Sequence, residues 1–97
     1  MGGILKKQNE KDMAQVTVTL ESETRSNIVK VDEVIILNAP GTKTLDLSEG
    51  GHVMTWQMEG EVGEKYTLKL VGGMPPMNNT FTLNDQFDFG FHDFAIQ

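Results

Sequence analysis

The chain has 97 residues and no cysteine, and its formal net charge is −6, from 14 acidic side chains against 8 lysines and arginines. This length suits one domain, and the lack of cysteine excludes disulfides, thiolate metal sites and thiolate nucleophiles. The acidic balance argues against binding to nucleic acid, because that function needs clustered basic side chains facing the phosphates.

The first twelve residues differ in charge from the rest of the chain. They hold three basic side chains, Lys6, Lys7 and Lys11. We find neither a secretory signal nor an apolar run long enough to span a membrane. We interpret residues 1–12 as a flexible basic leader and residues 13–97 as a single domain. We expect no membrane insertion, and the sequence leaves the cellular location open.

Apolar side chains recur at every second position from Ala14 onward, which predicts strands with one buried face. Residues 15–21, with the sequence QVTVTLE, bury Val16, Val18 and Leu20 in this interpretation. Residues 27–38 are rich in β-branched side chains, but the apolar phase changes at Asp32-Glu33. We therefore expect a bulge or a break at that point.

Glycine and proline separate the next segments. Pro40-Gly41 is a standard turn pair, and the short strand after it has Leu45 and Leu47 facing inward. Residues 52–59 and 65–70 alternate in the same way. Their shared buried face consists of Met54, Trp56, Met58, Tyr66, Leu68 and Leu70. Because only a glycine-containing turn at 60–63 lies between them, the two segments predict a hairpin in the core.

The C-terminal third contains a loop and two further strands. The loop is GGMPPMNN at 72–79, and the next strand, at 80–83, has Phe81 and Leu83 facing inward. The last strand covers residues 86–96. Its alternation separates Phe87, Phe89 and Phe91, which we assign to the core, from Asp88, Gly90 and His92, which we assign to the outer face.

The apolar phase of the last strand changes after Phe91. Phe94 and Ile96 stand at even positions, whereas the three preceding phenylalanines stand at odd ones. We interpret the change as a β-bulge at His92-Asp93, where one inserted residue would exchange the two faces.

Seven strand-like segments joined by glycine and proline turns predict an all-β fold, a small antiparallel β-sandwich. In WQMEGEVGEKYTLKL, at 56–70, a tryptophan on one strand is followed by a tyrosine on the next. This stretch of about fifteen residues resembles fibronectin-III and bacterial immunoglobulin-like modules. The resemblance implies an immunoglobulin-like architecture of about seven strands, and it implies no function.

The acidic C-terminal segment is one candidate site. A bulge would re-aim its side chains, so that Asp85, Asp88, His92 and Asp93 could chelate a divalent ion such as calcium. The alternative is that Asp88 and His92 are solvated side chains on an edge strand, where charges hinder aggregation. No zinc-type spacing occurs in the sequence.

The loop at 72–79 is a second candidate, because it carries apolar side chains where surface loops are usually polar. These are Met74, Pro75, Pro76 and Met77. Prolines reduce the entropy lost on binding and methionines adapt to irregular surfaces, so these four residues could contact a partner protein. The alternative is that Met74 and Met77 fold back and cover the open end of the sandwich.

Catalytic patterns are absent from the sequence. Ser48 and His52 are four residues apart across two glycines, which suits a turn, and no nucleophile elbow, Walker or dinucleotide-binding pattern occurs. We therefore expect no enzyme activity. Trp56, Tyr66 and the phenylalanines share their parity with aliphatic residues, so we assign them to the core and not to a platform for sugar rings.

These observations favour a non-enzymatic protein-interaction or accessory module that needs no cofactor. It would bind through the loop at 74–77 or through an exposed strand edge, and its acidic surface would attract a basic protein. The alternative is a small-ligand module, for calcium or carbohydrate, that uses the acidic C-terminal segment. An exposed edge such as residues 15–21 would also permit a homodimer.

Overall fold

A computed structural model describes residues 13–97, so the leader expected at 1–12 lies outside the described residues. The described chain forms two antiparallel sheets of four strands each. The strands are β1 (Met13–Ser22), β2 (Ser26–Val31), β3 (Val34–Leu37), β4 (Gly41–Ser48), β5 (Gly50–Glu59), β6 (Lys65–Val71), β7 (Met77–Thr82) and β8 (Phe87–Ile96). The predicted small antiparallel β-sandwich is confirmed, with eight strands where about seven were expected.

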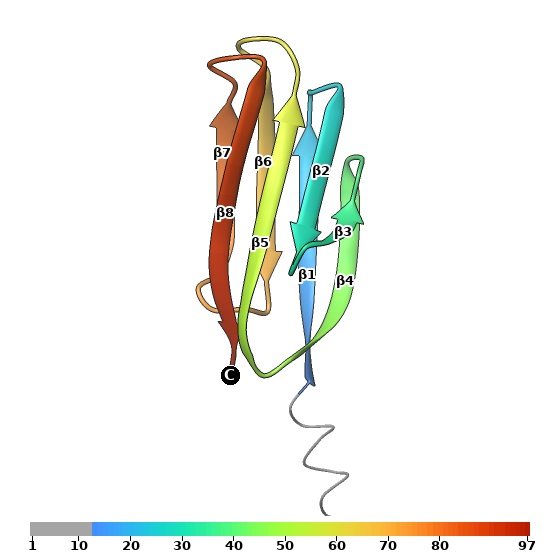
Figure 1. Cartoon of the computed structure of the whole chain (residues 1–97), viewed down its shortest axis with the longest axis vertical. Coiled ribbons are helices and arrows are strands. Elements are labelled where there is room, and N and C mark those ends of the chain that lie inside the picture. Colours follow the sequence, from blue (N-terminus) through green and yellow to red (C-terminus); the bar gives the residue numbers. More distant parts are fainter. Residues whose placement is uncertain (1–12) are drawn as a thin grey trace, which may run out of the picture.

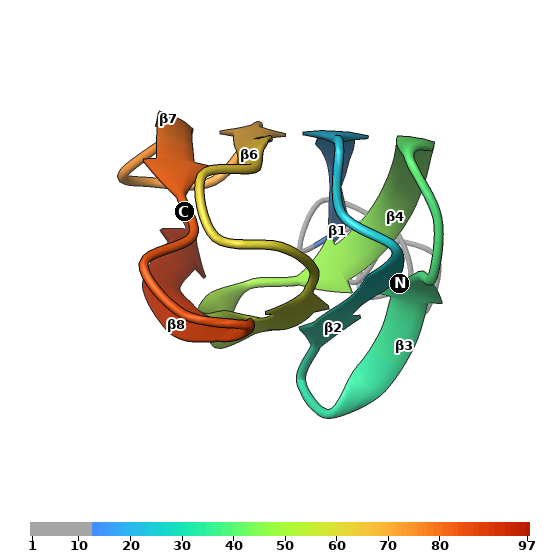
Figure 2. The ribbon, with the colours of Figure 1, turned by 90° about the horizontal axis from the view of Figure 1, so that it is seen from above.

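The strand order is β4-β1-β6-β7 in the first sheet and β3-β2-β5-β8 in the second. Figure 2 shows the two sheets as two layers, with β7 and β8 on one side of the sandwich and β4 and β3 on the other. Within residues 13–97 only β2–β3 and β6–β7 are sequential strands that pair in one sheet. Every other connection between consecutive strands crosses from one sheet to the other.

Two expectations about strand pairing are wrong. The segments at 52–59 and 65–70 do not form a hairpin, because β5 pairs with β2 and β8 whereas β6 pairs with β1 and β7. Residues 15–21 do not form an edge either, since β1 lies between β4 and β6. The strands at the sheet edges are β3, β4, β7 and β8.

The hydrophobic core lies between the sheets, and the alternation predicted for β1, β5 and β6 is confirmed. Trp56 and Tyr66 belong to this core. Its buried residues are Val16, Val18, Leu20, Val29, Val31, Met54, Trp56, Met58, Tyr66, Leu68, Leu70, Met77, Leu83, Phe94 and Ile96. Burial of each large apolar side chain contributes about 1.5–3 kcal/mol to folding, so this set is the main source of stability.

The phase predicted for the last strand is wrong. The side chains of Phe87, Phe89 and Phe91 are exposed, whereas Phe94 and Ile96 are buried. The register of β8 against β5 continues without a shift along all ten residues of the strand, so the expected bulge at His92-Asp93 is absent. The even positions face the sandwich interior from one end of β8 to the other.

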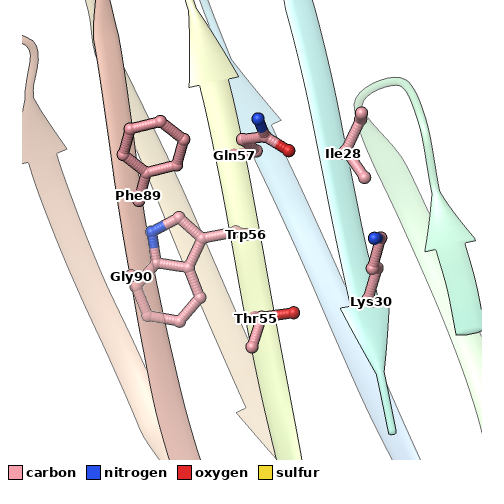
Figure 3. Close-up of a pocket in the computed structure, with 7 residues that line it drawn as sticks. All are labelled: Ile28, Lys30, Thr55, Trp56, Gln57, Phe89 and Gly90. Carbon is pink, nitrogen blue, oxygen red and sulfur yellow. The ribbon is translucent and has the colours of Figure 1, made fainter. Parts of the chain in front are cut away.

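The neighbouring strand β5 explains why the phenylalanines of β8 face outward. Trp56 of β5 pairs with Gly90, and its indole ring fills the space into which a Cβ at position 90 would project (Figure 3). The indole N–H donates to the Tyr66 hydroxyl at 2.9 Å, and that hydroxyl donates to Asp88 Oδ2 at 2.5 Å. The inward positions 88 and 90 therefore accommodate a tyrosine and a tryptophan, and the phenylalanines face outward.

The expected break at Asp32-Glu33 is confirmed as the turn between β2 and β3. Both residues have positive φ, 50° and 70°, as in the two-residue turns that close β-hairpins. Asp32 is held there by Val53, whose N–H donates to Asp32 Oδ1 at 3.0 Å and whose carbonyl accepts from the Asp32 N–H at 2.9 Å. His52 completes the contact, with Nδ1 at 2.5 Å from Asp32 Oδ2.

The His52 ring lies between two acceptors, because its Nε2 is 2.7 Å from the backbone carbonyl of Ser48. Both ring nitrogens can donate only when the ring is protonated, so the two contacts favour the cationic form. The hydrogen bond to Asp32, followed by that to Ser48, raises the pKa of His52 above its usual 6.5. Burial alone would raise the pKa of Asp32, but the bonds from His52 and Val53 outweigh it and lower that pKa below 3.8.

The His52–Asp32 pair predicts that the unfolding free energy depends on pH. The raised pKa of His52 stabilises the fold below pH 6.5, and this contribution is lost as pH rises through the folded-state pKa. The lowered pKa of Asp32 contributes above 3.8 and is lost as pH falls through its folded-state value. We expect the loss of unfolding free energy in His52→Gln to be greatest at about pH 4–6.5. Urea unfolding at pH 5 and pH 9 measures it, and equal losses at both pH values would contradict the expectation.

The indole over Gly90 predicts a second stability effect. Gly90→Ala places a methyl group against the Trp56 ring, so it should lower the unfolding free energy by about 1–3 kcal/mol. The matched control is Gly51→Ala on β5, where no atom lies within 4 Å of the added methyl group and the effect should stay within about 0.5 kcal/mol. Chemical denaturation measures the unfolding free energy of both variants. Equal losses would contradict the prediction, because they would show that the indole ring shifts without cost.

Candidate functional site

The open edge of β8 has unpaired backbone groups. Ala95 exchanges two hydrogen bonds with Met74, at 3.0 and 2.9 Å, on the side of β8 that faces away from β5. Alternate residues of a strand direct their backbone groups to opposite sides, and so the other odd-numbered residues also point away from β5. The N–H and C=O groups of Phe87, Phe89 and Phe91 therefore lie along the open edge.

The side chains of the same three residues cover the outer face of β8, and we call this surface the phenylalanine face. Phe87, Phe89 and Phe91 are 51%, 65% and 70% exposed. Since a phenylalanine side chain has about 150–250 Å² of surface, the three expose on the order of 300–450 Å² of apolar area. This area approaches the largest apolar patch of a typical monomer, and such patches are often functional.

The phenylalanine face continues across the second sheet as a mixed surface. The register places Phe89 beside Gln57, which in turn lies beside Ile28, and it places Phe91 beside Thr55 and then Lys30. All of these residues except Phe91 border a shallow pocket of about 240 Å³ (Figure 3). An aromatic column on β8 therefore lies next to a polar column on β5.

A second hollow, of about 490 Å³, opens between strands β7 and β8, and we call it the β7–β8 cleft. Its apolar lining comes from Trp56, Met77, Phe81, Phe89 and Phe91, its polar lining comes from Asn79, Asp88 and His92, and Gly90 completes it. The Phe81 ring packs against Trp56 and Tyr66, with ring centroids 5.6 and 5.0 Å apart. The cleft thus combines an aromatic floor with a few polar groups, which is typical of binding pockets.

The four residues of the metal hypothesis have separate surroundings. Asp88 and His92 face the interior, where the first accepts from Tyr66 and the second contacts the Pro75 carbonyl through Nε2 at 2.7 Å. Their expected outward position is therefore wrong. Asp93 lies on the opposite face of the strand, and Asp85 accepts from the Gln86 N–H in the preceding turn. Within residues 13–97 no group of three or more His, Cys, Asp or Glu side chains is placed to hold a metal ion.

The residues of the loop hypothesis divide into two groups. Met74, Pro75 and Pro76 are exposed, whereas Met77 is the first residue of β7 and belongs to the core. The alternative in which both methionines cover the core therefore holds for Met77 alone. The loop is bonded to β8 through Ala95 and His92, so its exposed part borders the same strand edge as the phenylalanine face.

The phenylalanine face is the feature that sequence reasoning missed. The available signal was the parity of Phe94 and Ile96, because a continuous strand extends that buried parity back to Asp88 and Gly90. The β-bulge that we assumed at His92-Asp93 cancelled this signal, because it exchanged the two faces of the strand. An inward aspartate was also unexpected, since its acceptor role depends on Tyr66, a residue of the other sheet.

The chain was compared with protein-family models, with curated proteins and with solved structures, and none of them matches it. The expected immunoglobulin-like character therefore has no support from relatives. Residues 13–97 contain no helix of the length and apolarity needed to span a membrane.

The free edge predicts alternating amide exchange along β8. The amides of Phe87, Phe89 and Phe91 should exchange at least about tenfold faster than those of Asp88, Gly90 and His92, because only the even residues bond to β5. Hydrogen exchange followed by NMR in dilute protein measures the pattern. Uniform protection along the strand would show that something already covers the edge.

Proposed function

We propose that the protein is a non-enzymatic interaction module that binds an extended segment of a partner protein along the open edge of β8. One observation carries the proposal: the same three residues present unpaired backbone groups and exposed aromatic side chains. An added strand would pair with those backbone groups, and its outward side chains would pack on the phenylalanine face. Backbone pairing supplies affinity, and side-chain contacts supply selectivity.

The other edge strands suit this role less well. β3 has only four residues, and short edge strands hinder pairing with other chains. The exposed side chains of β4 and β7 are mostly polar, such as Thr42, Lys43, Asn78 and Thr80. β8 combines ten residues with an aromatic outer face, so it is the edge best suited to a partner strand.

The loop that we expected to contact a partner fits this proposal in part. Met74, Pro75 and Pro76 border the edge where Ala95 is already paired, so they would contact a partner that extends beyond Asp93. Met77 is buried in the core, so it is not part of the exposed loop surface and could meet a partner only where it lines the β7–β8 cleft. The loop thus marks the end of the free edge.

The proposal predicts that Phe89 dominates binding. Peptides of twelve residues selected on a yeast-display library against the chain should carry an apolar side chain at every second position, where it would pack on the phenylalanine face. Phe89→Ser should weaken their binding at least tenfold, because burial of a phenylalanine contributes about 1.5–3 kcal/mol. The melting temperature should change little, since the side chain is 65% exposed.

The matched control is Val71→Ser, which alters an apolar residue of similar exposure, 64%, on β6 of the other sheet. Titration calorimetry of selected peptides against the three proteins measures the effect. Equal affinities for wild type, Phe89→Ser and Val71→Ser would place the binding surface elsewhere.

A further inference from the structure

The β7–β8 cleft indicates what kind of strand fits the open edge. Given the proposed function, on which this inference rests, we propose that the partner strand is basic and directs a lysine or arginine side chain into the cleft opposite Asp88. Asp88 would thus select the partner, and the phenylalanine face would hold it.

The position of Asp88 follows from the alternation of β8. Phe87 and Phe89 would exchange hydrogen bonds with an added antiparallel strand, so Asp88 lies at a non-hydrogen-bonded pair position between them. In such pairs the Cα atoms are about 4.5 Å apart and the side chains are at their closest. The residue opposite Asp88 would point to the inner face of the sheet, toward the cleft.

The Asp88 carboxylate has no cationic partner within residues 13–97. Its Oδ2 accepts from the Tyr66 hydroxyl, and none of the ion pairs of the described chain includes it. Burial, and then the bond to Asp88, raise the pKa of Tyr66, so the phenol stays a neutral donor. Oδ1 accepts no hydrogen bond in this part of the chain and can therefore receive an incoming ammonium or guanidinium group.

The charge around β8 favours the same partner. No lysine or arginine follows Lys69, whereas Asp85, Asp88 and Asp93 all lie in or beside β8. The chain as a whole carries a net charge of −6. This field attracts basic segments and accelerates their association.

Gly90 adds a second requirement. A residue opposite Gly90 would point into the β7–β8 cleft, which Trp56 and Gly90 line, so an apolar side chain there would contact the edge of the indole. The preferred antiparallel strand thus has apolar residues opposite Phe91, Gly90 and Phe89, followed by a basic residue opposite Asp88.

A second copy of the chain fits less well. Two β8 strands paired about Phe89 would align their phenylalanines, but each Asp88 would face the Gly90 of the other copy. Both carboxylates would then be covered without a cation, and both copies would carry the same net charge. An inward charge on an edge strand is a known means of preventing such self-pairing.

The test uses the whole chain and two end-capped peptides, Thr-Val-Leu-Val-Lys-Val-Thr and the same peptide with Glu in place of Lys. We expect the Lys peptide to bind at least about tenfold tighter at low salt, measured by titration calorimetry. Asp88→Asn should reduce this preference to less than about threefold, because the amide oxygen still accepts from Tyr66 but the charge is gone. The control Asp46→Asn removes an exposed charge from β4 of the other sheet and should leave the preference unchanged.

The other outcomes separate the two proposals. Equal binding of both peptides to wild-type protein, with loss of both in Phe89→Ser, would overturn the basic partner but leave strand addition in place. If neither peptide binds and sedimentation velocity shows a monomer, both proposals fail. A concentration-dependent dimer that Phe89→Ser converts to a monomer would make a second copy the occupant and overturn the basic partner. The comparison of the two peptides on wild-type protein stands even if Asp88→Asn does not fold.

Discussion

Two linked hydrogen bonds join the two sheets and determine how β8 is oriented: a buried one from Trp56 to Tyr66 and a part-buried one from Tyr66 to Asp88. A buried indole N–H or phenol without a partner costs about 1–3 kcal/mol, so both groups need acceptors inside the sandwich. Tyr66 accepts from the indole, and Asp88 accepts from Tyr66. Asp88 must therefore face inward, and the Trp56 ring leaves no space for a side chain at Gly90.

The outward phenylalanines are a consequence of this network. Because side chains of a strand alternate between two faces, inward positions at 88 and 90 require outward positions at 87, 89 and 91. A shift of one residue would bury the three phenylalanines, but it would turn Asp88 away from the phenol and leave the phenol without its acceptor. The apolar surface on which we base the proposed function is thus tied to the polar interior of the same strand.

The two roles of Asp88 are compatible because a carboxylate has two oxygens. Oδ2 satisfies Tyr66 within the fold, and Oδ1, which accepts no hydrogen bond within residues 13–97, is the atom that we propose for a cation from outside. The exposed phenylalanines make the edge attractive to other strands, and self-association is the hazard of such a surface. The acidic charge of the chain, with an aspartate inside the edge strand, opposes pairing between two copies while favouring a basic partner.

The sequence by itself determined the fold class, the approximate strand segments and the buried faces of β1, β5 and β6. At 15–21, 54–59 and 65–70, which make up most of those strands, apolar residues alternate with polar ones, and a period of two leaves one choice of buried face. Tertiary structure alone decided that β1 is interior, that β5 and β6 lie in different sheets, and that β8 is an open edge, because pairing between distant strands leaves no local pattern. It also decided the orientation of β8, where both faces carry apolar residues. There the buried face depends on Trp56 of the neighbouring strand and Tyr66 of the opposite sheet, whose contacts with Gly90 and Asp88 exist only in the folded chain.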